Sequence, residues 1–142
     1  MGSDPRIDII QATDAIFPWI IGTFVKSLEN QRSFADIDRH LARAMLRSLA
    51  TRLLAHEIVV AVDPADHDQC YGYAIGDAAN RILWWAYVKY DFRGRHVGRR
   101  LLEALLGDVG KSSISLAIPT SASRHLADKW FLVNQSELLE DL

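Results

Sequence analysis

One short stretch of the chain combines arginines and glycines at a spacing suited to binding phosphate. Four arginines fall within eight positions, and two glycines stand among them. Arginine forms charge-assisted hydrogen bonds with phosphate oxygens, and glycine lets the backbone approach a ligand closely. The pattern therefore predicts a site for a phosphate-bearing small ligand. The stretch consists of Arg93, Gly94, Arg95, His96, Val97, Gly98, Arg99 and Arg100.

The elements on either side would position these residues. An aromatic strand is predicted over 81–90, and an amphipathic helix from Arg99 to about Val109, before a stop at Gly110. The first amides of a helix have no partners within it and lie at the positive end of its dipole, so they bind phosphate readily. The stretch over 87–102 contains neither G-x-G-x-x-G nor Gly-Lys-Ser/Thr. The residues alone predict a pyrophosphate-type ligand at this helix start, with an ordinary strand–helix turn bearing exposed arginines as the alternative.

The other elements follow from periodicity and turn residues. We expect a helix capped by Thr13 that runs to about Leu28, and a second helix capped by Asp36 with an apolar face from Ile37 to Leu53. The order is β, two helices, three strands, α, β, α. It predicts a mixed α/β or α+β domain with an antiparallel meander in the middle. The expected strands cover 7–11, 57–63, 70–76, 81–90, 113–118 and part of 132–139, and the last helix covers 122–131.

Composition limits the class of protein. With 142 residues, 49% apolar content and a net charge of -2, the chain is expected to be a single folded domain over 1–142. Residues 1–5 are expected to be a remnant of cloning or disordered. The sequence has no run of about 18 apolar residues, one cysteine and no secretory pattern, so we expect a cytoplasmic protein without a membrane span. An isoelectric point near 6.2 argues against general nucleic-acid binding.

The stretch over 87–102 resembles the acyl-CoA-binding motif of the GNAT superfamily of N-acyltransferases. That motif has Gln or Arg, two variable residues, Gly, one variable residue, then Gly or Ala, after a strand that ends in an aromatic residue and Val. Arg93 and Gly98 match its ends, Tyr87-Val88 match the pair, and His96 replaces the central glycine. The element order also resembles that family. The resemblance implies a GNAT-like fold, with a mixed, mainly antiparallel sheet flanked by helices, and N-acetyltransferase activity.

The resemblance also implies how acetyl-CoA would bind. Amides from Arg95 to Arg99 would hold the pyrophosphate, and the strand edge at Tyr87 and Val88 would pair with the pantetheine arm. The Val88 amide would polarise the thioester carbonyl, and a primary amine on a small molecule or peptide would attack it directly. The strand over 113–118 would part from the aromatic strand to form the cleft. The implied cofactor-binding residues are Tyr87, Val88, Arg93, Gly94, Arg95, His96, Val97, Gly98 and Arg99.

The groups that would move protons depart from the family pattern. Direct attack needs a base, but residues 81–90 contain no Asp or Glu, which leaves Glu57 and Asp77 at strand ends. Trp130 stands where many members have a tyrosine acid, and an indole N–H is no useful acid. Tyr87 and Tyr90 are the nearby phenols, and core packing is the expected role for each, with proton donation by Tyr87 as the alternative.

The end of the chain keeps a second hypothesis open. Residues 132–142 suffice for about one of the two strands that usually close the family's sheet. The sheet would then have an exposed edge, or a second copy would complete it in a homodimer. Together with His96 and the missing strand carboxylate, this favours as the alternative a catalytically inactive GNAT-fold protein that serves as a binding or assembly module.

Three other features are assigned to the fold. The run Asp66-His67-Asp68-Gln69-Cys70 has no second ligand cluster, so we expect a hairpin turn and no metal site. Trp84 and Trp85 are adjacent in a strand and should point to opposite faces. An arginine stripe at 39, 43 and 47 is expected to be a solvated helix face, with attraction of an acidic substrate as the alternative.

Overall fold

The fold is built on a sheet whose strands come from the β-branched and aromatic runs of the sequence. The computed structural model describes residues 6–29, 36–93, 96–107, 114–116 and 132–134, and within them six strands pair in the order β1-β2-β3-β4-β5-β6. The first four strands pair antiparallel in succession, whereas β5 is parallel to β4 and β6 is parallel to β5. The strands are β1 (Asp8–Gln11), β2 (Glu57–Asp63), β3 (Asp66–Asp77), β4 (Ile82–Val88), β5 (Ile114–Leu116) and β6 (Leu132–Asn134).

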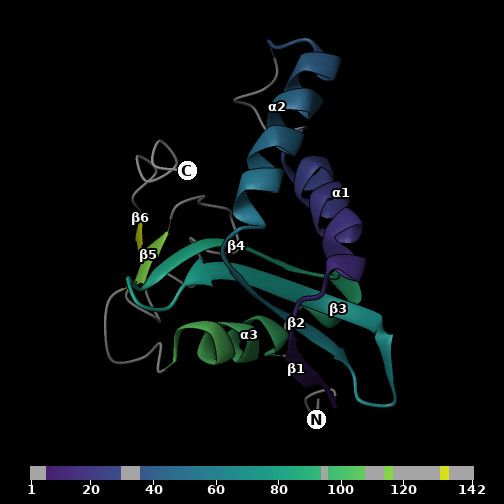
Figure 1. Ribbon diagram of the computed structural model, residues 1–142, viewed down its shortest axis with the longest axis vertical. Helices are drawn as coiled ribbons and strands as arrows, with labels where there is room; N and C mark the ends of the chain where they lie inside the picture. The colour runs from purple at the N-terminus through teal and green to yellow at the C-terminus, as the bar shows by residue number, and fades with distance from the viewer. Residues whose placement is uncertain (1–5, 30–35, 94–95, 108–113, 117–131, 135–142) are drawn as a thin grey trace.

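The helices divide between the two faces of the sheet (Figure 1). α1 (Phe17–Leu28), which follows the 3₁₀ turn η1 (Asp14–Ile16), lies with α2 (Arg39–Leu53) on one face. α3 (Val97–Leu106) lies on the other. Each side has its own apolar cluster, since the alternating side chains of the strands feed both. None of the described helices is long and apolar enough to cross a membrane.

The α3 face fixes the helix that follows the arginine-rich stretch. Val97, Leu101 and Leu102 are buried at a helical spacing, together with Leu105 and Leu106, against β2, β3 and β4. α3 begins two residues before the predicted start and ends at Leu106 with Gly107 at a φ of 80°. The predicted stop at Gly110 lies outside the described residues.

The second helix differs from its prediction in cap and in face. Asp38, not Asp36, caps α2, and its carboxylate accepts hydrogen bonds from the amides of His40 at 3.0 Å and Leu41 at 3.2 Å. The side chains of Leu41 and Met45 are 55% and 50% exposed, so the predicted apolar face is wrong there. The side chains of α2 that are buried lie on the next face of the helix, where the alanines permit close contact with α1. They are Ala42, Leu46, Ala50 and Leu53.

The hairpin between β2 and β3 is tighter than predicted. Asp63 pairs with Asp66, so only Pro64 and Ala65 form the turn, and β3 begins at Asp66 instead of Cys70. His67 lies 3.4 Å from the Asp8 carboxylate, a contact that ties the hairpin to β1. Within the described part of the chain, no three His, Cys, Asp or Glu side chains are grouped as a metal site would require.

A bulge in β4 explains the packing of the two tryptophans. Ile75 pairs with Trp85 whereas Gly76 pairs with Leu83, so Trp84 is an extra residue in β4. The alternation slips by one position, and both Trp84 and Trp85 are buried in the cluster on the α1 and α2 face. The prediction that they point to opposite faces is therefore wrong.

The remaining predicted elements have different outcomes. β1 and β2 agree with prediction to within a residue or two at each end, and β5 and β6 fall inside the predicted ranges. α1 ends at Leu28 as predicted but begins at Phe17, three residues late, because η1 takes up the first turn. Thr13 precedes η1 in an extended conformation, without a capping hydrogen bond from its side chain. The helix predicted over 122–131, which includes Trp130, lies outside the described residues.

Candidate functional site

The carboxyl end of β4 presents its backbone to the edge away from β3. Val88 pairs with Gly72, and the next amide, that of Lys89, donates to the Tyr71 carbonyl at 2.8 Å. Backbone groups alternate in direction along a strand, so the N–H and C=O of Val88 point away from β3. This is the geometry that an added extended chain needs for pairing.

The neighbouring strand reaches only the other end of β4. β5 pairs with Ile82 and Leu83. Among the described residues, no strand pairs with the outer edge of β4 at Tyr87 and Val88. The backbone groups at that edge are therefore without a strand partner among the described residues, as pairing with an added extended ligand requires.

A compact turn connects β4 to α3. The 3₁₀ turn η3 (Tyr90–Phe92) is closed by hydrogen bonds from the Phe92 amide to the Lys89 carbonyl and from the Arg93 amide to the Tyr90 carbonyl. The Phe92 ring stacks on Tyr71 with centroids 4.0 Å apart. The Tyr71 hydroxyl donates to the Asp63 carboxylate at 2.7 Å. That hydrogen bond lowers the pKa of Asp63 and raises the pKa of Tyr71, and it anchors the base of the turn.

α3 begins beside the same strand edge. His96 adopts the left-handed conformation, with φ at 63° and ψ at 13°, and its carbonyl accepts the helical bond from the Arg100 amide at 3.0 Å. A Cβ built on Gly98 would meet only the Val88 Cγ2 atom, at 3.7 Å. The first turn of α3, with amides that have no partner inside the helix, is therefore adjacent to the Val88 edge.

His96 stands where the family pattern has glycine, and it adopts a conformation that glycine adopts at little cost. A left-handed residue costs about 1–2 kcal/mol unless it is glycine, and histidine is among the side chains found there more often than most. The backbone at His96 nevertheless has the left-handed conformation, so the fold bears this cost in free energy. An ordinary conformation, in which a side chain would be tolerated freely, is not what the structure has.

The described arginines of the stretch each contact the protein. The Arg93 Nε donates to the Val88 carbonyl at 2.8 Å, and the Arg99 Nε donates to Glu103 at 2.9 Å. Arg100 donates to the Ile7 carbonyl at 3.2 Å and so ties α3 to the segment before β1. Gly94 and Arg95 lie outside the described residues. Arg93 and Arg100 thus contact backbone carbonyls, Arg99 pairs within α3, and Arg93 reaches the strand edge itself. Binding of phosphate by these side chains stays a prediction.

Tyr87 lies on the opposite face from Val88, among aromatic rings. Its ring centroid is 6.1 Å from Trp19 and 5.8 Å from Tyr73, and the Arg93 guanidinium lies 5.8 Å above it. Tyr73 is fully buried, and its hydroxyl contacts Thr23 at 2.7 Å and accepts from the Trp85 indole at 3.1 Å. Burial raises the pKa of Tyr73 to about 12, so this phenol stays protonated. Tyr90 is 80% exposed, which differs from the predicted core role.

Glu57 and Asp77 lie together at the other end of the sheet. Glu57 pairs with Gly76, and Asp77 pairs with Ile82 at the start of β4. Asn80 donates side-chain and backbone hydrogen bonds to Asp77, and these lower the pKa of that carboxyl. Six strand residues at about 3.3 Å each put roughly 20 Å between this end and Val88. The structure therefore does not bring these two carboxylates to the turn, whereas it does bring Tyr87 there.

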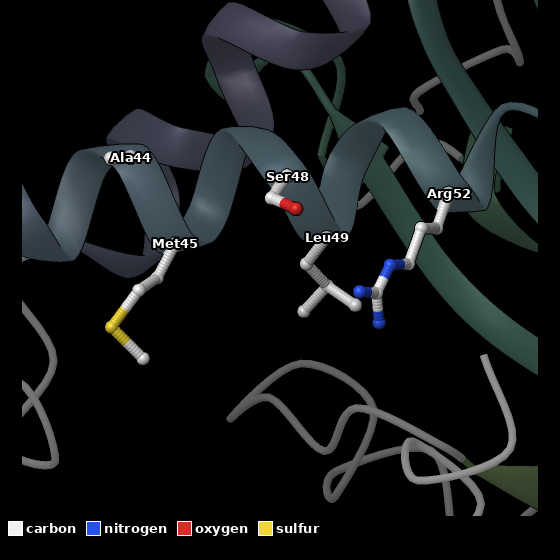
Figure 2. A pocket seen from close by; sticks show the side chains of 5 residues that line it. All are labelled: Ala44, Met45, Ser48, Leu49 and Arg52. Atoms are coloured by element: carbon white, nitrogen blue, oxygen red, sulfur yellow. The ribbon is translucent and has the colours of Figure 1, made fainter.

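A separate hollow of about 410 Å³ lies on the outer face of α2 (Figure 2). Its lining is confined to one helix, so it includes neither β4 nor α3. On another face of α2, Arg43, whose side chain is 41% exposed, forms an ion pair with Glu29 at 2.6 Å, so the charge of one arginine of the predicted stripe is paired within the chain. The lining residues of the hollow are Ala44, Met45, Ser48, Leu49 and Arg52.

Gly72 is a site residue that the sequence analysis missed. A Cβ at this position would lie 2.6 Å from the Tyr87 carbonyl oxygen and 3.1 Å from the Val88 Cα, so only glycine allows β3 to approach β4 so closely. An isolated glycine within a strand pattern is the signal that points to such an approach. The bond between Arg93 and Val88 had no comparable signal, because it depends on how the turn folds back.

Several solved structures share the fold of this chain. A GCN5-related N-acetyltransferase from Rhodopseudomonas palustris aligns with a TM-score of 0.62 and 17% identity, over 90% of this chain and 82% of that one. A Corynebacterium glutamicum protein described as histone acetyltransferase HPA2 and related acetyltransferase aligns with a TM-score of 0.61 and 23% identity, over 87% and 83%. No protein-family profile and no curated protein matches the sequence. The structural likeness shows that the chain has the GNAT acetyltransferase fold.

Proposed function

We propose that this chain is a single-domain N-acetyltransferase that transfers an acetyl group from acetyl-CoA to a primary amine by direct attack. The observation that carries the proposal is that the start of α3 packs beside Val88, whose backbone faces outward: a Cβ on Gly98 would lie 3.7 Å from the Val88 Cγ2 atom. A helix N-terminus suits a pyrophosphate, and a free strand edge suits an amide-bearing arm. The two similar structures named above are described as acetyltransferases, which supports the same assignment.

Each part of the site has a proposed role. The amides from Arg95 to Arg99 hold the pyrophosphate, and Val88 pairs with the pantetheine arm and polarises the thioester carbonyl through its N–H. The attacking amine forms the new C–N bond as the C–S bond breaks, and coenzyme A leaves as a thiolate that must be protonated. Tyr87 lies at this end of β4 and is the proposed donor of that proton. The proton of the attacking amine passes to water, and Glu57 and Asp77 stay the alternative bases, since their distance would require a chain of water molecules to the amine.

A second candidate function rests on β4 itself. The middle of β4 holds Trp84 and Trp85, and none of its residues from Ile82 to Val88 carries a carboxylate. Without a nearby base, the chain would bind coenzyme A and not transfer acetyl groups. The second candidate is therefore an inactive GNAT-fold binding or assembly module.

The test separates binding from turnover. Isothermal titration calorimetry with acetyl-CoA at tens of micromolar is expected to show binding, and a panel of small-molecule and peptide amines is expected to release coenzyme A thiol. Absence of binding would overturn the donor site. Binding without thiol release above the amine-free rate on a broad panel would favour the inactive module.

A further inference from the structure

The Arg93 side chain occupies the strand edge that the donor arm needs. Its Nε donates to the outward carbonyl of Val88 at 2.8 Å. Neighbouring strands lie about 4.8 Å apart, so a guanidinium at this distance fills the space of an added strand. An extended arm cannot pair along Val88 while Arg93 remains there.

Aromatic rings hold Arg93 in that position. Its guanidinium carbon lies 5.8 Å from the ring centroid of Tyr87 and 5.8 Å from that of Tyr90. Cation–π contacts of this kind stabilise an exposed arginine weakly, and the hydrogen bond from Arg93 is to a neutral acceptor. The contacts are therefore sufficient to keep Arg93 on the edge and weak enough to be exchanged.

A phosphate group offers Arg93 a stronger partner nearby. Arg93 is three residues before His96, whose carbonyl accepts the first bond of α3. Hydrogen bonds from arginine to an ionised phosphate are roughly twice as strong as those between neutral groups, and they are often bidentate. A ligand with phosphates at the start of α3 can thus draw Arg93 from the carbonyl, whereas a phosphate-free ligand has nothing to exchange for it.

We propose that Arg93 is a specificity-determining residue that covers the Val88 edge until a phosphate-bearing thioester displaces it. The inference rests on the proposed function, since it concerns the same donor site. Arg93 then selects coenzyme A thioesters against thioesters that carry the same pantetheine arm without phosphates. This role differs from that of a simple phosphate ligand, because removing the Arg93 side chain would tighten the binding of pantetheine and weaken the binding of coenzyme A.

The experiment compares coenzyme A and pantetheine by NMR titration of the ¹⁵N-labelled protein, following the Val88 amide. In Arg93→Met, the affinity for coenzyme A is expected to fall about 10-fold or more, because phosphate contacts are lost. The affinity for pantetheine is expected to rise several-fold, because the edge is uncovered. Arg93→Lys keeps the charge but not the planar fork, so it should bind pantetheine more tightly and lose less of the coenzyme A affinity. Arg47→Met on α2 is the matched charge-loss control and should leave both affinities unchanged.

The outcomes distinguish the two proposals. If both ligands weaken together in Arg93→Met, or if only coenzyme A weakens, the covering role of Arg93 is overturned while the donor site stands. If the unaltered protein binds neither ligand, the proposed function and the role of Arg93 both fall. A melting temperature for each variant within a few degrees of the unaltered protein's ensures that the comparison concerns binding and not folding.

Discussion

The two ends of β4 differ in what they offer a ligand. At the carboxyl end, the Val88 backbone points outward beside the start of α3, and the groups around it are basic or aromatic. At the amino end, Ile82 is paired on both sides, with β3 and with β5, and the nearby Asp77 carboxylate is satisfied by Asn80. The backbone geometry at the carboxyl end therefore indicates the candidate site more strongly than the titratable side chains at the amino end, which have no free strand edge beside them.

The largest expected effect is at the carboxyl end. Gly98→Trp should lower the affinity for coenzyme A about 100-fold or more, equivalent to about 2.7 kcal/mol, since an indole would cover the first turn of α3. Calorimetry measures the effect. Gly98→Ala is the matched control: its Cβ would meet only Val88 Cγ2 at 3.7 Å, so binding should change by no more than about 3-fold. Unchanged binding in Gly98→Trp would move the donor site away from α3.

The buried phenol beneath Tyr87 should make stability depend on pH in the alkaline range. The Tyr73 pKa is raised to about 12 from an ordinary value of 10.0, so the unfolded chain loses this proton first as pH rises. The free energy of unfolding should therefore fall by about 2–3 kcal/mol between pH 10 and pH 12 through this group, and be unaffected by it below pH 10. Denaturant titrations of Tyr73→Phe should lack that part of the fall, whereas the exposed Tyr90→Phe should retain it. An identical fall in Tyr73→Phe would show that this phenol is not the cause.

Substitutions at two glycines of β3 test the difference between the two ends of β4 directly. A Cβ would lie 2.6 Å from the Tyr87 carbonyl at Gly72 and 2.5 Å from the Ile82 carbonyl at Gly76. Each substitution to alanine should destabilise the protein by about 1–3 kcal/mol, because the backbones must move apart. Only Gly72→Ala should also weaken the binding of coenzyme A, since it displaces Val88. Equal losses of coenzyme A affinity would erase the functional difference between the two ends.

A smaller effect is expected from relieving the left-handed turn. His96→Gly should raise the free energy of unfolding by up to about 1 kcal/mol. The substitution removes the strain of a left-handed histidine, and this gain exceeds the cost of ordering a glycine that is more mobile in the unfolded chain. It should also tighten coenzyme A binding a few-fold by removing a side chain from the start of α3. His96→Asn keeps a side chain that tolerates this conformation, so it is the control for the effect on binding. Weaker binding in His96→Gly would show that the imidazole contributes a contact.

The smallest effects are expected at the amino end. Asp77→Asn and Glu57→Gln should each change kcat/KM for acetyl transfer by less than about 3-fold, because roughly 20 Å of strand separates them from Val88. Tyr87→Phe should have the larger effect. A fall of about 100-fold in either carboxylate variant, with the melting temperature retained, would place proton transfer at the amino end after all.

Much of the fold could be predicted because local chemistry determined it. The β-branched run of β2 and the strand–turn–helix around Val88 are specified by residue type and spacing, and they carried the resemblance to the GNAT fold. The cap at Asp38 and the buried face of α2 were missed, because the packing of α1 against α2 selects the row that contains Ala42 and Ala50 over the row that contains Leu41 and Met45. The bulge at Trp84 was missed since register is set by the neighbouring strand.

The candidate site was predicted in outline but not in its contacts. Tyr87, Val88, His96 and Gly98 do come together, because they are close in sequence around one turn. The Arg93 bond to Val88 and the close approach at Gly72 depend on how the turn and β3 pack, and no spacing rule encodes them. The distance of Glu57 and Asp77 from the turn likewise follows from strand pairing and not from residue type.

The proposed binding of coenzyme A at the carboxyl end of β4 can be mapped residue by residue. The most direct measurement is an amide NMR titration of the ¹⁵N-labelled protein with coenzyme A. The largest shifts are predicted at Val88 and at the first turn of α3, from Val97 to Arg99, with little change around Asp77. Shifts confined to the hollow on α2 around Met45, or no saturable shifts at all, would contradict the account.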